Sequence, residues 1–192
     1  MVLEKHPVEN AAHDEAAGST NYRSGDINVA MAVALESGGL ITPTLQKCNT
    51  LDMYSVGRAW KDLVGKAKAK SLSPAEYNSG AFFISNLPGN VRGGAVRLDP
   101  PQGKKKDTHK ILTLLCSTRS LSLPQKGAGA ILAVAASLPK VKQMPNGSIG
   151  VVKEMSVTIT CDHRYIYGAD AALFLKDLAE LIEQNPESMM FH

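Results

Sequence analysis

The stretch CDHRYIYGAD, residues 161–170, holds the residue types in this chain that are best suited to chemistry. His163 follows an alternating run at 157–160 and precedes a helical pattern that begins near Gly168. Side chains at such junctions are held by rigid elements while facing a cleft, and a neutral imidazole is a competent general base near pH 7. The position therefore predicts either a general base or a histidine with a purely structural role in a turn.

The residues beside the histidine have different expected roles. Asp162 and Arg164 are predicted to stabilise the turn rather than to contact the imidazole, because adjacent extended residues point to opposite sides. Cys161 has a nucleophilic thiol, but no spacing places a base beside it. We therefore expect a buried core cysteine at this position.

No other motif indicates a reaction or a metal site. The sequence lacks the GxSxG, P-loop and GxGxxG patterns. Its three cysteines form no CxxC pair, which argues against a disulfide framework and favours a reducing compartment. No metal cofactor is predicted, since the remaining histidines share no metal-ligand spacing; they are His6, His13, His109 and His192.

The composition is typical of one globular domain. The 192 residues are 44% hydrophobic and 20% charged, and the net charge of +3 is too small to mark the whole molecule as a nucleic-acid binder. No apolar run reaches membrane-spanning length, so no membrane partner is predicted. The first 17 residues carry four acidic side chains, unlike a signal or transit peptide. We expect a chain that stays where it is made, or a mature or truncated form.

Hydrophobic periodicity predicts about six strands and two long helices. Helices are expected at 51–70, capped by Thr50, and at 168–184. The inward face of the second helix is expected to carry Leu173, Phe174, Leu178, Leu181 and Ile182. The strands are expected at 27–35, 40–42, 81–85, 129–137, 151–152 and 155–160. This mixture predicts a two-layer α/β sandwich.

Residues 88–123 depart from the regular pattern. The segment holds seven Lys or Arg side chains against two Asp side chains, together with Pro100-Pro101 and several glycines. A loop of this length is unusual inside a compact domain, so the segment is interpreted as a functional insertion or as a translated intron. It contains no Phe, Tyr or Trp for base stacking. Nucleic-acid binding there would be electrostatic, and a solvated charged surface is the favoured interpretation.

Four motifs, in the same order, resemble the dihydrolipoamide acyltransferase family, the core enzymes of 2-oxoacid dehydrogenase complexes. They are INVAMAVALESGGLITPTLQ, GAFFISNLP, LPQKGAGAILAVAAS and SVTITCDHRYIYGADAALFL. The resemblance implies a chloramphenicol acetyltransferase-like α/β fold, a mixed sheet with helices on one face. The form IYGAD is similar to the plastid branch of pyruvate dehydrogenase complexes. A location in the chloroplast stroma is therefore implied, with the mitochondrial matrix as the alternative.

The resemblance also implies roles for individual residues. His163 corresponds to the general base that takes a proton from the thiol of coenzyme A or dihydrolipoamide. Ser85 corresponds to the hydroxyl that hydrogen-bonds the oxyanion, a contribution of about 10²–10³ in rate. The two residues are expected to come from neighbouring subunits of a homotrimer that builds a larger hollow core, with residues 189–191 contacting the next trimer. Coenzyme A is the implied co-substrate, and a separate domain supplies the lipoyl group.

Further site residues and departures from the family pattern leave alternatives open. Tyr167 stands where the family has Asp or Asn, and it either hydrogen-bonds near the site or only packs. The resemblance also implies that the histidine's own backbone carbonyl orients the imidazole, and a tyrosine at 167 does not disturb that contact. Asn86 joins Asp162, Arg164 and Tyr167 as candidate site organisers. Thr42 and Pro43 are candidates for the wall of the substrate channel.

The domain organisation expected from the resemblance is a single acyltransferase catalytic domain, truncated at its N-terminus. No lipoyl or peripheral-subunit-binding domain is expected, so other components of a pyruvate dehydrogenase complex are the implied partners. Pro88 replaces a family glycine at the start of the basic segment. An inactive or structural core subunit is therefore the alternative to an active enzyme.

Overall fold

The computed structural model describes residues 1–14, 17–22, 25–35, 38–86, 128–143 and 147–184. The basic segment 88–123 and residues 189–191 lie outside these ranges. The helices are α1 (Val2–Lys5), α2 (Met53–Lys68), α3 (Ala75–Asn78) and α4 (Gly168–Gln184), with a 3₁₀ turn at Cys48–Thr50. The strands are β1 (Ala11–Asp14), β2 (Ser19–Tyr22), β3 (Val29–Met31), β4 (Val33–Ala34), β5 (Leu40–Ile41), β6 (Thr44–Leu45), β7 (Phe82–Asn86), β8 (Ala130–Gln143) and β9 (Ile149–Cys161).

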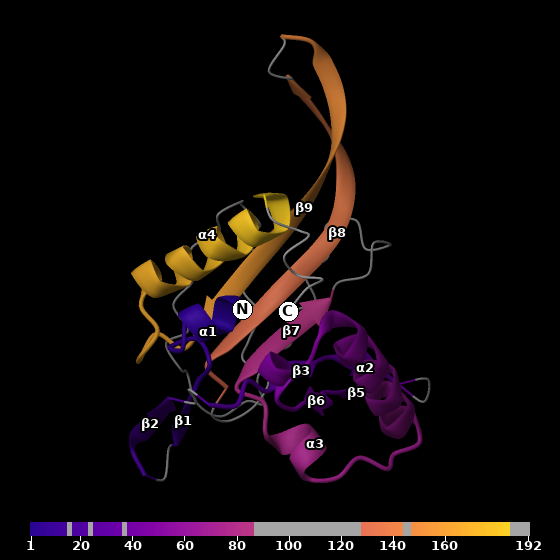
Figure 1. The fold of residues 1–192 in the computed structure, drawn as a ribbon, viewed down its shortest axis with the longest axis vertical. Helices are drawn as coiled ribbons and strands as arrows, with labels where there is room; N and C mark the ends of the chain where they lie inside the picture. The colour runs from indigo at the N-terminus through magenta and orange to yellow at the C-terminus, as the bar shows by residue number, and fades with distance from the viewer. Residues whose placement is uncertain (15–16, 23–24, 36–37, 87–127, 144–146, 185–192) are drawn as a thin grey trace.

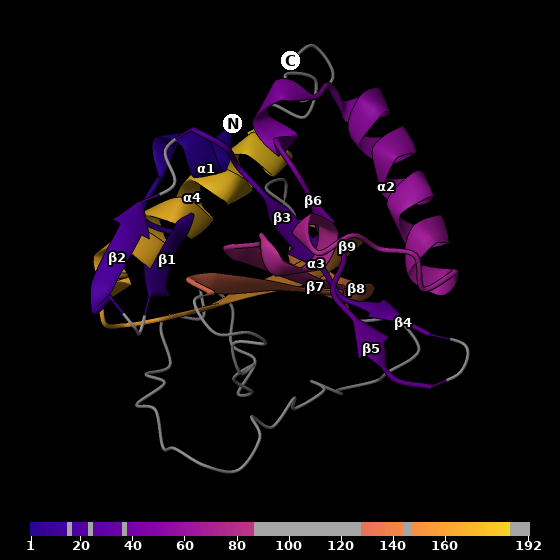
Figure 2. The same ribbon diagram turned by 90° about the horizontal axis from the view of Figure 1, so that it is seen from below.

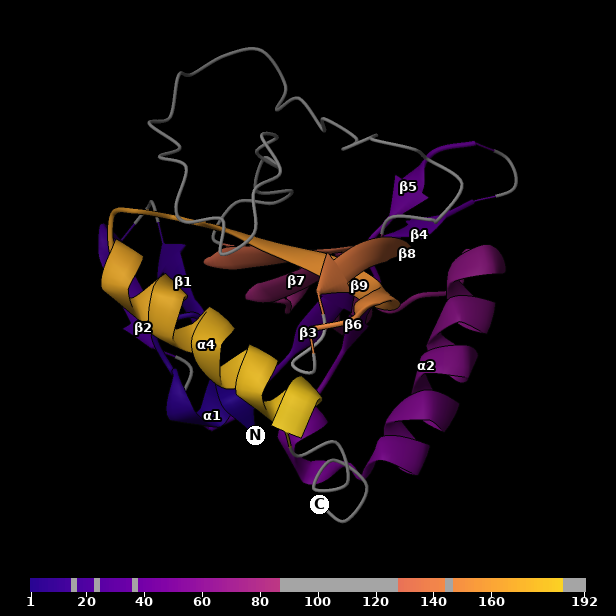
Figure 3. The same cartoon turned by 90° about the horizontal axis from the view of Figure 1, so that it is seen from above.

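A five-stranded mixed sheet forms the centre of the fold, in the order β6-β3-β7-β8-β9. Strands β3, β7 and β8 run parallel to one another, while β6 and β9 run antiparallel to their neighbours. Helices α1, α2 and α4 lie to one side of the sheet, and the small β4–β5 sheet lies to the other (Figures 2 and 3). The predicted arrangement, a mixed sheet with helices on one face, is confirmed.

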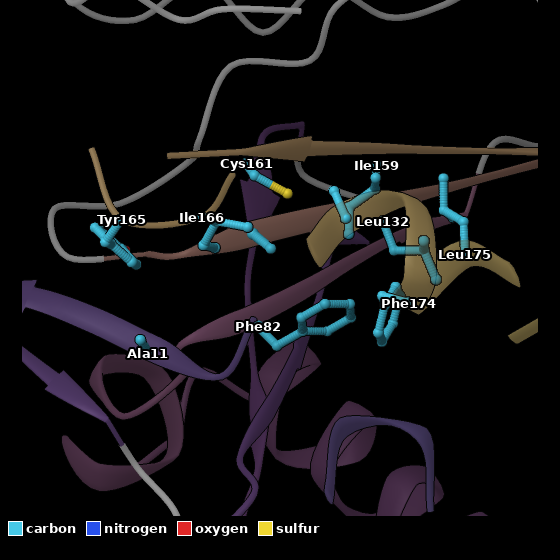
Figure 4. Packing of buried hydrophobic residues seen from close by; sticks show 11 residues of the cluster. Ala11, Phe82, Leu132, Ile159, Cys161, Tyr165, Ile166, Phe174 and Leu175 are labelled. Carbon is cyan, nitrogen blue, oxygen red and sulfur yellow. The ribbon is translucent and has the colours of Figure 1, made fainter. Parts of the chain in front are cut away.

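Alternate residues of the central strands build the core between the sheet and α4. Phe82, Leu132 and Ile159 come from three neighbouring strands and are at most 6% exposed. They pack with Phe174 of α4, whose ring centroid lies 5.6 Å from that of Phe82 (Figure 4). Full burial of such side chains stabilises a fold by about 1.5–3 kcal/mol each. Ile166, in the turn before α4, is also fully buried here, so the core anchors the turn that carries His163.

Two predictions near the N-terminal half are corrected by the structure. The strand predicted at 27–35 is divided into β3 and β4, which belong to different sheets. The long helix starts at Met53 rather than at 51, and its cap is Asp52, whose Oδ1 accepts the backbone N–H of Ser55 at 2.8 Å. Thr50 instead ends the 3₁₀ turn and donates its hydroxyl to the Lys47 carbonyl. An aspartate at this position also satisfies a free N–H of the first turn.

Helix α4 has the predicted bounds but a narrower buried face. Leu173 is 52% exposed and Ile182 is 41% exposed, although both were predicted to face inward. The residues that pack on the sheet follow the spacing i, i+3, i+4 and i+7: Ala171, Phe174, Leu175 and Leu178. A single helical stripe covers the sheet, so apolar residues outside that stripe remain in contact with solvent.

Strands β8 and β9 form a hairpin that projects from the body of the molecule (Figure 1). The prediction ended the first strand at residue 137, whereas β8 continues to Gln143. A β-bulge lies between Val134 and Ser137, where β7 ends, and beyond it the two strands continue as a ribbon. Val141 and Val151 face each other across this ribbon and are each 70% exposed. We name Val141, Ile149, Val151 and Met155 the hairpin stripe, since their pairing and alternate spacing place them on one face.

The N-terminal segment packs against α4 and was not predicted, because α1, β1 and β2 are four residues each and too short to show periodicity. His6 lies 3.0 Å from Asp177 of α4, measured between Nε2 and Oδ2. Glu9 is fully buried, and no described residue hydrogen-bonds either of its carboxylate oxygens. Burial raises the pKa of Glu9 above the ordinary 4.5.

We expect Glu9→Gln to stabilise the protein at neutral and alkaline pH. Because the folded-state pKa of Glu9 is raised, the stability linked to this group is fully present below pH 4.5 and is lost as the pH rises through the folded pKa. Glutamine mimics the protonated acid and removes that loss. Thermal unfolding from pH 4 to pH 9 should therefore show the variant's advantage growing with pH. Glu4→Gln, a change at an exposed glutamate of α1, is the matched control; a constant difference across pH at Glu9 would contradict the prediction.

None of the helices in the described part of the chain is both long enough and apolar enough to cross a membrane.

Candidate active site

His163 lies in the turn between β9 and α4, as the sequence predicted. Its Nδ1 is 3.0 Å from the carbonyl oxygen of Ile166. A carbonyl only accepts hydrogen bonds, so Nδ1 carries the proton and donates, and Nε2 is left with a lone pair. We expected the histidine's own carbonyl in this role; the structure places the Ile166 carbonyl there. Because the Ile166 side chain is buried in the core, this acceptor is held in place.

Asp162 and Arg164 stabilise the turn around the histidine, as predicted. The Arg164 Nε donates to both carboxylate oxygens of Asp162, at 2.9 and 3.0 Å, and Nη2 forms an ion pair with Oδ2. The backbone N–H of Arg164 also donates to Asp162 Oδ1 at 3.1 Å. Burial acts to raise the pKa of Asp162, but these hydrogen bonds outweigh burial and hold it below its usual range. The Asp162 carboxylate is therefore ionised at neutral pH, and its bonds to Arg164 stabilise the turn.

Tyr167, a candidate site organiser, lies in contact with the imidazole. Its ring lies edge-on to that of His163, with centroids 5.9 Å apart and planes inclined by 70°. Its backbone N–H donates to Oδ2 of Asp170 at 3.2 Å, and its carbonyl accepts the N–H of Ala171 at 3.2 Å. These bonds fix Tyr167 at the first turn of α4. The sequence signal that identified it was its spacing of four residues from the histidine.

Gly129 connects the histidine turn to the N-terminal segment. Its carbonyl accepts the N–H of Asp162 at 2.9 Å, and its own N–H donates to the Ala81 carbonyl at 3.0 Å. A Cβ atom at this position would lie 2.3 Å from the backbone oxygen of Ala11 and 3.2 Å from the Tyr165 hydroxyl. Only a glycine permits this close approach between β1 and the start of β8.

We expect Gly129→Ala to destabilise the protein by about 3 kcal/mol or more, because the added methyl meets backbone rather than a movable side chain. The measurement is thermal or denaturant unfolding of the variant and the wild type. Gly65→Ala is the matched control, since nothing lies within 4 Å of its added Cβ. That change, inside α2, should stabilise by up to about 1 kcal/mol. Equal stability of the two variants would show that β1 does not approach Gly129 closely in solution.

Ser85 lies on β7, two strands away from β9, the strand that leads to the His163 turn. It is 8% exposed and stands opposite Ala133 of β8, which in turn stands opposite Thr158 of β9. With strands about 4.8 Å apart and residues about 3.3 Å apart along a strand, Ser85 lies about 14 Å from Cys161, where β9 ends. The histidine follows two residues later. With this strand register, the Ser85 hydroxyl and the His163 imidazole of one chain do not meet at a common reacting atom.

The remaining predicted site residues occupy separate places in the fold. Asn86 is exposed at the end of β7. Thr42 and Pro43 lie where the chain passes from β5 to β6, Thr42 being half-buried and Pro43 fully buried. The Pro43 carbonyl accepts the N–H of Met31 at 3.1 Å, so Pro43 has a packing role within one chain. At this bend Thr42 remains a candidate for the channel wall, whereas the ring of Pro43 is buried within the chain.

Cys161 is the buried core residue that the sequence predicted. Its side chain is fully buried in the cluster of Figure 4, and burial raises the pKa of its thiol to about 12. The thiol therefore stays protonated at neutral pH and is unsuited to nucleophilic attack. Within the described residues no group of three His, Cys, Asp or Glu side chains is arranged to hold a metal ion.

The chain matches the family model of the 2-oxoacid dehydrogenases acyltransferase catalytic domain over residues 1–102 and 120–191. The unmatched internal stretch, residues 103–119, lies inside the basic segment. Two relatives from Arabidopsis thaliana are each 42% identical: the dihydrolipoyllysine-residue acetyltransferase components 5 and 4 of the chloroplastic pyruvate dehydrogenase complex. The matches cover 100% and 98% of this chain but 35% and 33% of those proteins. The chain therefore spans about a third of their length.

Solved structures show the same fold. The cubic core of a pyruvate dehydrogenase multienzyme complex aligns with a TM-score of 0.71 at 19% identity, covering 98% of this chain and 65% of that one. The dihydrolipoamide acetyltransferase of Azotobacter vinelandii, studied for the catalytic roles of a serine, a histidine and an asparagine, aligns with the same score, identity and coverage. Chloramphenicol acetyltransferase aligns with a TM-score of 0.54 at 15% identity, covering 95% and 72%. The chain belongs to the 2-oxoacid dehydrogenase acyltransferase family, as a catalytic domain with the chloramphenicol acetyltransferase-like fold.

Proposed function

We propose that this chain transfers an acetyl group between dihydrolipoamide and coenzyme A, as the acyltransferase core of a pyruvate dehydrogenase complex. The observation that carries the proposal is the hydrogen bond from His163 Nδ1 to the Ile166 carbonyl. It puts the ring proton on Nδ1, so that Nε2 is the nitrogen that accepts a proton, at a turn anchored by the core. The identity to chloroplastic acetyltransferase components supports the same reaction and a plastid location, with the mitochondrial matrix as the alternative.

The reaction begins with removal of the thiol proton of coenzyme A by Nε2 of His163. The thiolate attacks the carbonyl carbon of the acetyl thioester on the lipoyl group, and the carbonyl π electrons move to the oxygen. Ser85 donates its hydroxyl to this oxyanion. Collapse of the tetrahedral intermediate breaks the carbon–sulfur bond to the lipoyl group, and the departing thiolate takes the proton from the imidazolium. The products are acetyl-coenzyme A and dihydrolipoamide, and no metal takes part.

A second copy of the chain is needed because Ser85 and His163 lie far apart in one copy. The solved relative that forms a cubic core supports assembly of such copies into a larger particle. We propose a homotrimer as the unit, with His163 of one subunit facing Ser85 of its neighbour. Asn86, which follows Ser85 and is exposed, is then a candidate to organise the oxyanion side of the site. Thr42 is a candidate for the wall of the substrate channel. Lipoyl domains and the other components of the complex are the partners.

Subunit complementation tests this arrangement. The His163→Ala and Ser85→Ala chains are each purified, mixed in denaturant and refolded together, and acetyl transfer from acetyl-coenzyme A to dihydrolipoamide is measured. Each chain alone should be inactive. In a randomly mixed assembly about a quarter of the sites combine an intact histidine with an intact serine, so the mixture should recover about that fraction of wild-type activity.

Other outcomes have distinct meanings. A mixture that stays inactive while the wild type is active would place both groups in one subunit, whereas an active Ser85→Ala chain would remove Ser85 from the site. An inactive wild type that assembles normally would favour the alternative function, that of a structural core subunit.

A further inference from the structure

Tyr167 lies beside His163, the candidate general base, and contacts its ring. Tyr167 is 61% exposed, yet its ring forms a T-shaped contact with the His163 imidazole, with the two ring centroids 5.9 Å apart. The relative from Azotobacter vinelandii was studied for a histidine and an asparagine spaced four residues apart, the same spacing as His163 and Tyr167. An aromatic ring cannot replace an amide as a hydrogen-bond donor and acceptor, so its contribution must have another physical basis.

We infer that Tyr167 is a positioning residue, and that its ring, rather than its hydroxyl, holds the imidazole in the orientation in which Nδ1 donates to Ile166. This inference rests on the proposed function and deepens it. A ring inclined by 70° at this distance is the edge-to-face geometry that aromatic pairs prefer. No described residue hydrogen-bonds the Tyr167 hydroxyl, whereas the backbone of Tyr167 is held on both sides by the first turn of α4.

The Ile166 carbonyl and the Tyr167 ring restrain different parts of the imidazole. The Ile166 carbonyl fixes the nitrogen edge of His163 through one hydrogen bond. Rotation of the ring about the Cβ–Cγ bond would move both ring nitrogens. Tyr167 packs against the ring and opposes that rotation. Because rotation moves Nε2 away from the incoming thiol, loss of the Tyr167 ring should slow the proton transfer step more than substrate binding.

Asp170 supports this contact from α4. Its Oδ2 accepts the Tyr167 N–H, which places the backbone of the tyrosine at the start of the helix. The helix itself is fixed by the packing of Phe174 and Leu175 in the core. The position of the Tyr167 ring is therefore determined by the same elements that determine the position of the histidine turn.

The test compares Tyr167→Phe with Tyr167→Ala, using Tyr54→Ala as a control at an exposed tyrosine on α2. Two quantities are measured: kcat and KM for acetyl transfer, and the rate at which diethyl pyrocarbonate modifies His163, followed by peptide mass spectrometry. Tyr167→Phe should stay within about twofold of wild type in both. Tyr167→Ala should lower kcat by about five- to tenfold with little change in KM. It should also raise the modification rate of His163 severalfold while His6 and His13 react as in wild type.

Each result decides the matter. If Tyr167→Phe loses as much kcat as Tyr167→Ala, the hydroxyl acts and the inference is overturned. If Tyr167→Ala reacts with diethyl pyrocarbonate as the wild type does, the ring does not restrain the imidazole and the inference is equally overturned. Since the modification rate needs no acetyl transfer, it tests the role of Tyr167 even where the wild type proves inactive, an outcome that counts only against the proposed function.

Discussion

Acetyl transfer by His163→Ala is expected to fall by about 10³ in kcat, with KM for the thiol changing little. General-base catalysis contributes about 10²–10⁴ in rate. The neighbouring carboxylate of Asp162 is bound to Arg164, and the Cys161 thiol is buried and protonated. The measurement is steady-state acetyl transfer from acetyl-coenzyme A to dihydrolipoamide at pH 7.

The matched control for this change is His13→Gln. His13 stacks on Tyr165 and lies 3.3 Å from the Thr20 hydroxyl, and it has no role in the proposed reaction. We expect this variant to keep activity close to that of the wild type. Retention of more than about a tenth of the wild-type kcat by a correctly assembled His163→Ala chain would remove the histidine from the role of base.

Removal of the hairpin stripe is expected to dissociate the assembly and abolish acetyl transfer. The stripe leaves large apolar side chains in water, with Ile149 79% exposed and Val141 and Val151 each 70% exposed. It lies on the same face of β9 as Val157 and Ile159, which pack toward α4 nearer the body. An isolated two-stranded ribbon is only marginally stable in water, so burial against a neighbouring subunit would both order the ribbon and cover the stripe.

The sharpest variant is the double change Val141→Lys and Val151→Glu. Opposite charges on facing residues retain a favourable cross-strand pair, so the hairpin itself should survive while its apolar contact is lost. We expect the dissociation constant of the assembly to rise by about two orders of magnitude or more. Sedimentation velocity at micromolar concentration would then show smaller species.

The control for the hairpin is Tyr54→Lys, which introduces a charge at a 69% exposed aromatic side chain of α2. This variant should sediment as the wild type does. An intact assembly in the double variant would mean that the hairpin stripe faces solvent in the particle and that other surfaces join the subunits.

Local periodicity was sufficient to predict the elements that carry the candidate site. The predicted helix 168–184 agrees in both bounds with α4, and the predicted strand 81–85 lies within one residue of β7. The position of His163 in a turn between a strand and a helix, and the role of Asp162 and Arg164 in stabilising that turn, also followed from residue order. Such features depend on neighbours in the chain, so short-range patterns record them. The motifs were specific enough to predict the family, which the comparisons confirm.

Only the tertiary structure decided how these elements meet. No pattern in the sequence indicates that the Ile166 carbonyl accepts a hydrogen bond from His163 Nδ1, or that Ala11 leaves no room for a side chain at Gly129. The division of residues 27–35 between two sheets and the distance between Ser85 and His163 depend on which strands become neighbours. These contacts join residues far apart in the chain, and their energies come from packing in three dimensions rather than from local preference.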